Sequence, residues 1–267
     1  FDYNKRTSRS VPAQLAVAYP YVVDYLAASA QLGGAPALIS KRRLDTIALN
    51  ADAGQLDRVT GDNLRIEAQV GGATLRSITS VREWWNPSQG GDLDGNGNIV
   101  GFQVSPAILA PPYDFVPIGV RPFGLYENVT ERRQRQWSQE LNLIGTLGER
   151  TDYVLGAFHF EERAREMESA RVGIIIPTPP IDLGGGVSIP AVGTILPTLI
   201  DYRHESTSTA LFGQSTYRIG DKASVTGGVR YTWDDKKLDL YSAGQPRVAA
   251  SFGQLTWLAA ARYQIDE

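Results

Sequence analysis

Apolar and polar residues alternate with a period of two along several stretches of the chain, most clearly along residues 210–233. In the second half of this segment, residues 225–233 place an apolar or small side chain on one face and a polar side chain on the other. Residues 211–219 show a similar alternation. A tight turn around Gly220 joins the two halves. The segment is therefore predicted to be an antiparallel hairpin.

Similar alternation, with turn residues between the runs, predicts eight strands in all. They are expected at residues 1–9, 62–70, 73–85, 132–144, 152–163, 204–219, 223–237 and 247–264. The connections alternate in length. Those at 71–72, 145–151 and 220–222 are tight, whereas those at 10–61, 86–131, 164–203 and 238–246 are long. Short turns on one side and long loops on the other are typical of outer-membrane β-barrels.

The aromatic residues of the 210–233 hairpin support a membrane barrel. Tyr217 lies just before the turn, and Tyr231 and Trp233 lie at the far end, about where two interfacial girdles would hold them. Within the first long connection, Tyr21–Leu32 is predicted to be a short helix that ends at Gly33.

Three runs, in order along the chain, resemble barrel strands of the TonB-dependent outer-membrane receptors, especially those of alphaproteobacteria. They are LRIEAQVGGATLRSITSVRE (64–83), QWSQELNLIGTLGERTDYVLGAFHFEE (136–162) and FGQSTYRIGDKASVTGGVRYTWDDKK (212–237). The resemblance implies an all-β, antiparallel, up-and-down transmembrane barrel of about 22 strands. Residues 1–267 would form part of that barrel domain, with long external loops. The plug domain and signal peptide would be absent, and Phe1 would begin in the middle of the barrel.

The same resemblance implies a location in the outer membrane and a role in active uptake of a scarce nutrient, such as a ferric siderophore, cobalamin or an oligosaccharide. The implied partners are outer-membrane lipid, a small nutrient ligand and the TonB complex, which would act through the missing plug. External loops would capture the ligand. The aromatic residues expected to contact it are Trp84, Trp85, Tyr113, Phe115 and Tyr126.

Composition excludes several other classes. Apolar residues make up 42% of the chain, charged residues 21%, and mean hydropathy is −0.21. The longest apolar-looking stretch, Gln14–Leu32, is interrupted by Pro20 and Asp24, so its pieces are too short to cross a bilayer as helices. A net charge of −3 argues against nucleic-acid binding, and the absence of cysteine removes disulfides and thiolate sites. We find no catalytic constellation and expect no enzyme activity and no cofactor.

One loop motif suggests a cation site. Asp92, Asp94 and Asn96 stand at positions one, three and five of a calcium-loop pattern, and Asn98 stands at the position that supplies a backbone carbonyl. Position twelve is Gln103, which cannot supply the bidentate carboxylate of an EF-hand. A weak calcium site and an unliganded Asx/Gly-rich turn both remain open.

The predicted strands also assign residues to two faces. We expect Arg65, Glu67, Arg76 and Arg82 to face a wet lumen, because an arginine facing lipid near the midplane costs about 2–4 kcal/mol. On the strand 152–163, the apolar positions Val154, Gly156, Phe158 and Phe160 are expected to face outward and His159 to face the lumen.

Two other fold classes fit some of these patterns. A small closed barrel of the same eight strands would be a passive pore or an adhesin, and it would pair its first and last strands. A secreted carbohydrate-binding β-sandwich would need each strand face to be buried or plainly solvated.

Overall fold

Long antiparallel strands dominate the computed structural model, which describes residues 1–9, 13–50, 54–92, 94–241 and 247–265. Within these residues the strands are β1 (Asp2–Arg9), β2 (Gly54–Val70), β3 (Ala73–Asp92), β4 (Ile99–Val104), β5 (Pro117–Phe123), β6 (Tyr126–Leu147), β7 (Thr151–Asp182), β8 (Ser188–Ile219), β9 (Ala223–Leu240) and β10 (Val248–Tyr263). One α-helix, α1 (Pro20–Gln31), and a short 3₁₀ helix, η1 (Pro106–Leu109), lie in the connections. The predicted helix is thus confirmed, and Gly33 follows it with a φ of 90°. No helix of the described residues is long and apolar enough to span a membrane.

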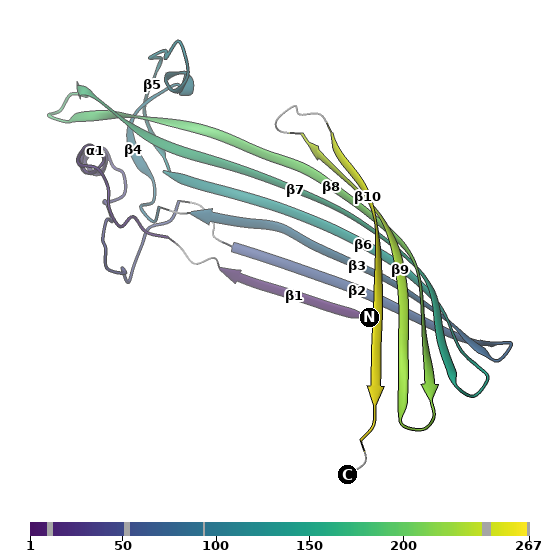
Figure 1. The fold of residues 1–267 in the computed structure, drawn as a ribbon. Coiled ribbons are helices and arrows are strands. Elements are labelled where there is room, and N and C mark those ends of the chain that lie inside the picture. Colours follow the sequence, from purple (N-terminus) through teal and green to yellow (C-terminus); the bar gives the residue numbers. More distant parts are fainter. Residues whose placement is uncertain (10–12, 51–53, 93, 242–246, 266–267) are drawn as a thin grey trace.

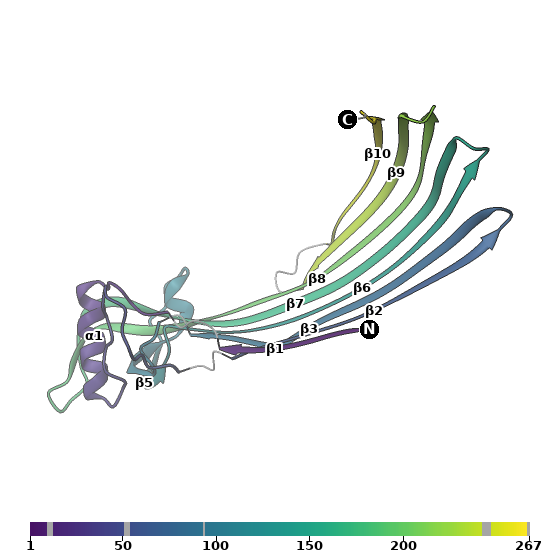
Figure 2. The same cartoon turned by 90° about the horizontal axis from the view of Figure 1, so that it is seen from below.

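Eight of these strands form a curved wall in the order β1-β2-β3-β6-β7-β8-β9-β10, and every neighbouring pair is antiparallel (Figure 1). The tight turns lie at one end of the wall and the long connections at the other. Within the described residues, β1 pairs only with β2 and β10 only with β9. The wall is therefore an open arc, as Figure 2 shows, and not a closed eight-stranded barrel or a two-layered sandwich.

Cross-strand register divides the wall into two faces. One row of directly opposed residues runs across β3, β6, β7, β8, β9 and β10 and is apolar or small: Leu75, Leu143, Leu155, Gly213, Val229 and Trp257. The adjacent row on the other face is mostly polar: Arg76, Asn142, Gly156, Phe212, Arg230 and Thr256. Because a transmembrane barrel turns its apolar face to lipid, we call the first face outward and the second lumenal.

Aromatic residues mark the two ends of the outward apolar band. Tyr153 and Tyr217 lie near the tight turns, and Trp137, Tyr231 and Trp233 lie toward the long connections. Trp233 is opposite Thr209, which is about eight residues from Tyr217 along β8, or roughly 27 Å of strand. At the usual barrel tilt this gives a band roughly 20 Å high, comparable with the apolar band of outer-membrane barrels.

The expected faces of the strand 152–163 were wrong. Phe158 is opposite Glu140 on β6, so it lies on the lumenal face, and His159 lies on the outward face with its ring 5.5 Å from that of Trp137. The Arg230 guanidinium lies over the rings of Phe158 and Phe212, at 5.5 and 5.4 Å from their centroids. Both faces of this strand carry apolar side chains, so only the partner strands determine which face meets lipid.

Two predicted loops were also wrong in part. Residues 164–203 are largely the outer halves of β7 and β8, and residues 86–131 contain the end of β3, the hairpin of β4 and β5, and the start of β6. In addition, β2 already begins at Gly54. Beyond the apolar band both faces of a strand meet water, so the alternation that marks a membrane strand is lost although the backbone pairing continues.

Described residues of two long connections, between β1 and β2 and between β3 and β6, fold into a cap with its own apolar core beside the outer ends of β7 and β8 (Figure 1). Tyr25 and Leu26 of α1 are almost fully buried against Ile99, Phe123 and Ile189. The Tyr25 and Phe123 rings meet edge to face with centroids 6.2 Å apart, and the Tyr25 hydroxyl donates to the Phe102 carbonyl at 3.3 Å. The cap therefore has an ordered position on the wall.

Candidate functional site

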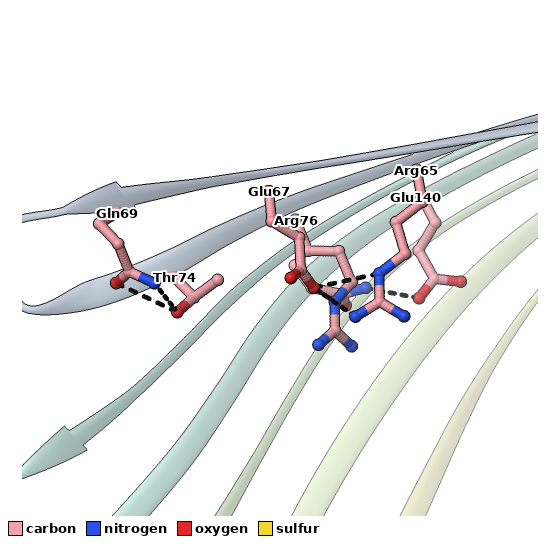
Figure 3. A network of polar contacts seen from close by, with 7 residues as sticks. Arg65, Glu67, Gln69, Thr74, Arg76 and Glu140 are labelled. Atoms are coloured by element: carbon pink, nitrogen blue, oxygen red, sulfur yellow. Dashed lines mark hydrogen bonds and ion pairs between the residues drawn. The ribbon is translucent and has the colours of Figure 1, made fainter.

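The lumenal face carries a polar network at the height of the apolar band, on β2, β3 and β6 (Figure 3). The Glu67 carboxylate accepts hydrogen bonds from the Arg65 and Arg76 guanidinium groups, the latter at 2.6 Å. Beside it, the Asn142 amide donates to Glu140 at 2.6 Å. The prediction that Arg65, Glu67 and Arg76 share one face is confirmed by the register of β2 and β3. Their charges are paired with one another, as a wet lumen allows.

A second lumenal group lies toward the cap, above the aromatic girdle. One register row brings together Asn86 of β3, Arg132 of β6, Glu166 of β7 and Tyr202 of β8. Arg132 forms a two-pronged ion pair with Glu166, with N–O distances of 2.7 and 3.2 Å, and the Tyr202 hydroxyl donates to the same carboxylate at 3.2 Å. Such a fork holds both side chains in one geometry.

The neighbouring rows extend this group across the wall. Gln134 and Gln136 both donate to the Glu162 carboxylate, and His204 Nδ1 lies 3.5 Å from the same group. On the β2–β3 side, Asp57 accepts from the Trp84 indole at 3.2 Å and from the Asn86 amide at 2.8 Å. We call these residues the lumenal cluster: Asp57, Trp84, Asn86, Arg132, Gln134, Gln136, Glu162, Glu166, Tyr202 and His204.

Electrostatics in the lumenal cluster follow from the Arg132–Glu166 pair. The hydrogen bond from Arg132 lowers the pKa of the Glu166 carboxyl below its usual range, so this group is an anion at neutral pH. Partial burial, and then the Glu166 charge, raise the pKa of the Tyr202 hydroxyl. Tyr202 therefore remains a neutral hydrogen-bond donor. The cluster presents amides, carboxylates, a guanidinium, an imidazole, a phenol and an indole, a mixture suited to binding a polar small molecule.

Comparison with protein families agrees with this architecture. The family model "TonB dependent receptor-like, beta-barrel" matches residues 11–267. The chain belongs to this family. No curated protein matches the sequence. Among solved structures, the siderophore receptor PiuA from Acinetobacter baumannii is similar, with 11% sequence identity and a TM-score of 0.46. The similarity covers 98% of this chain and 36% of PiuA, so the chain spans about a third of that receptor's length.

Membership of the TonB-dependent receptor family places the protein in the outer membrane. The family consists of transporters without enzyme activity. The wall is thus a segment of a barrel of this family.

The five predicted ligand-contacting aromatics of this receptor wall do not lie together. Trp84 and Tyr126 are on the lumenal face, and Trp84 belongs to the lumenal cluster. Trp85 points the other way, and the Arg58 guanidinium lies 5.0 Å from its ring centroid. Tyr113 and Phe115 are exposed in the connection between η1 and β5, which belongs to the cap. Adjacent residues on a strand point to opposite faces, so Trp84 and Trp85 have different surroundings.

The predicted calcium loop is ordered by hydrogen bonds from backbone amides. Asp92 Oδ1 accepts from the amides of Asp94 and Gly95 at 3.1 Å each, and Asp92 Oδ2 accepts from Asn50 at 2.9 Å. Asn96 Oδ1 accepts from Leu38 at 2.7 Å. The backbone carbonyl of Asn98 accepts from Ala35 at 2.8 Å. The loop therefore ties the segment before β2 to the end of β3.

Asp94 connects the same loop to β6. Its Oδ1 accepts from the Asn96 amide at 2.8 Å, and its Oδ2 accepts from the amides of Leu125 and Tyr126 at 3.0 Å each. Burial is the main cause that raises the pKa of this carboxyl. Among the described residues, no group of three or more His, Cys, Asp or Glu side chains is arranged to hold a metal ion. The structure gives the loop a role as a clamp, and calcium binding stays a prediction.

Several members of the lumenal cluster, including Arg132, Glu166 and Tyr202, were not among the site residues predicted from the sequence. Glu166 and Tyr202 fall in the segment 164–203, which was predicted to be a loop. The run Arg163-Ala164-Arg165-Glu166-Met167-Glu168 has charges on both faces and so lacks the alternation of a membrane strand. The available signal was its position next to a clear membrane strand, because barrel strands commonly extend beyond the bilayer on the side of the long loops.

Proposed function

We propose that this protein takes up a scarce nutrient across the outer membrane by TonB-dependent transport, and that the lumenal cluster is part of its ligand-binding surface. The nutrient classes we propose are a ferric siderophore, cobalamin or an oligosaccharide. Transport would further require a plug domain and the TonB complex.

The observation that carries this proposal is the position of the lumenal cluster. It lies on the lumenal face above the aromatic girdle, on the side of the wall that bears the cap and the long connections. A ligand arriving from outside would meet these side chains before it meets the Arg65–Glu67–Arg76 network nearer the tight turns. Trp84 offers an aromatic ring beside hydrogen-bonding groups on Asp57, to which its indole donates, and on Gln134, which is opposite it on β6; this is the combination that small-molecule sites use.

The test is uptake by cells that carry the full-length protein, with and without a functional TonB. Radiolabelled ferric hydroxamate siderophore, cobalamin and a malto-oligosaccharide serve as probes. We expect one of them to be taken up only when TonB is functional. Trp84→Ala should then raise the apparent KM about tenfold, which is typical of losing an aromatic contact at the centre of a binding surface.

Trp85→Ala is the matched control, because it removes the same side chain one residue along β3 and on the outward face. We expect it to leave the KM unchanged. A Trp84→Ala protein with the KM of the unsubstituted protein would show that the lumenal cluster does not bind the ligand. If none of the probes enters in a TonB-dependent way, the proposed nutrient classes are wrong.

A further inference from the structure

The outward face above the aromatic girdle carries arginines that are directly opposite one another. Arg133 of β6, Arg165 of β7 and Arg203 of β8 form one register row. In the next row toward the girdle, Arg135 of β6 is opposite Arg163 of β7. We call these five residues the arginine patch. Like charges directly opposite on neighbouring strands destabilise a sheet, so this arrangement favours a partner that supplies negative charge.

Acidic neighbours neutralise the arginine patch only in part. Arg165 is paired with Asp201 at 2.8 Å and Arg203 with Glu205 at 2.7 Å, yet their side chains remain 59% and 42% exposed. Arg135 is 3.2 Å from Glu83 and 69% exposed, and Arg163 is 4.0 Å from Glu161 and 66% exposed. The structure gives Arg133 no ion pair with any described residue, and its side chain is exposed. Guanidinium groups thus remain accessible to a further anion from outside the wall.

The height of the arginine patch indicates what that anion is. Arg135 is two residues from Trp137 along β6, or about 7 Å farther from the membrane centre along the strand. The rings of Trp137 and His159, and of Tyr231 and Trp233, mark the interface on the same outward face. Side chains that face outward directly above this girdle lie at the level of the lipid headgroups of the outer leaflet.

From this geometry we infer that the arginine patch binds phosphate-bearing lipid headgroups of the outer leaflet. The planar guanidinium fork matches phosphate oxygens in a two-pronged arrangement, and several forks in one row can hold one or more phosphates along the wall. The acidic residues beside the patch orient Arg165 and Arg203 without covering them. This inference rests on the outer-membrane wall and its register, and it is independent of which nutrient the protein transports.

The test uses the full-length protein purified in a neutral maltoside detergent. Native mass spectrometry measures binding of dihexanoyl phosphatidic acid, with dihexanoyl phosphatidylcholine and inorganic phosphate as separate probes. We expect saturable binding of phosphatidic acid that is stronger than binding of either other probe. A triple substitution, Arg133→Gln, Arg165→Gln and Arg203→Gln, should weaken this binding about a hundredfold, since each basic side chain near an anionic lipid surface contributes about fivefold.

Two further variants make the result specific. Arg65→Gln with Arg82→Gln removes arginines from the lumenal face of the same wall and should leave phosphatidic acid binding unchanged. Arg133→Gln alone breaks no ion pair among the described residues, so it keeps the inference testable if the triple variant does not fold; we expect about a fivefold loss. Equal binding by the substituted and unsubstituted proteins would overturn the inference. So would equal affinity for phosphatidylcholine or for inorganic phosphate, since the site would then not be one for anionic lipid headgroups.

Discussion

The loss of local stability expected when the Asp94 carboxylate is removed can be derived from its hydrogen bonds. Asp94 is 2% exposed, and its carboxylate accepts hydrogen bonds from three backbone amides, those of Asn96, Leu125 and Tyr126. Asp94→Ala leaves these donors without their acceptor, and each unmet buried donor costs about 1–3 kcal/mol. Removing a buried carboxylate also relieves its desolvation, which offsets part of the loss. We expect the region around the clamp to be destabilised by about 3 kcal/mol.

Amide hydrogen exchange in detergent measures this local stability. A change of about 3 kcal/mol corresponds to an opening equilibrium that is roughly a hundredfold more favourable, and the exchange of the Leu125 and Tyr126 amides should accelerate by that factor. Peptides from the turn between β2 and β3 should exchange as before. Asp114→Ala is the control, because Asp114 is an exposed carboxylate in the cap connection. Unchanged exchange at Leu125 and Tyr126 in Asp94→Ala would refute the clamp.

The stability of the closed Asp94 loop should change with pH in a definite direction. Because burial raises the pKa of Asp94, the closed loop binds the proton more tightly than the open loop does. Closure therefore weakens as the pH rises through the interval between the ordinary carboxyl pKa and the raised one. After correction for intrinsic exchange rates, protection of Leu125 and Tyr126 should fall across that interval. Asp94→Ala should lose this part of the pH dependence.

Two further predictions test the faces and the cap. Leu155→Arg places a charge on the outward face within the apolar band and should destabilise the inserted protein by about 2–4 kcal/mol, whereas Val154→Arg, on the lumenal face, should insert normally. Heat-modifiable mobility on gels measures the folded fraction, and equal folding of both variants would contradict the assigned faces. Gly101→Ala would overlap the buried Tyr25 hydroxyl and should loosen the cap by about 1–3 kcal/mol. Limited proteolysis around α1 measures this change. Gly227→Ala is the control, because a Cβ at that position would have no other atom within 4 Å. Equal cleavage of the two variants would argue against tight packing at Tyr25.

The sequence by itself determined the membrane part of this protein. The hairpin of β8 and β9, the tight turn after Val70 and the positions of Tyr217, Tyr231 and Trp233 could be read from alternation alone, because lipid on one face and water on the other require apolar and polar side chains in turn. The eight wall strands followed from these patterns, and the family followed from the resemblance of three runs, in order, to barrel strands of the TonB-dependent receptors.

Only the tertiary structure decided the rest. Above the girdle water reaches both faces, so no local pattern marks Glu166, Tyr202 or Arg203 as strand residues, and only pairing with neighbouring strands does. The faces of β7 likewise depended on its partners, because Phe158 and Leu155 are both apolar and only cross-strand register places one in the lumen and the other in lipid. The lumenal cluster and the arginine patch are assembled from strands far apart in the chain, and their residues become neighbours only when the wall forms.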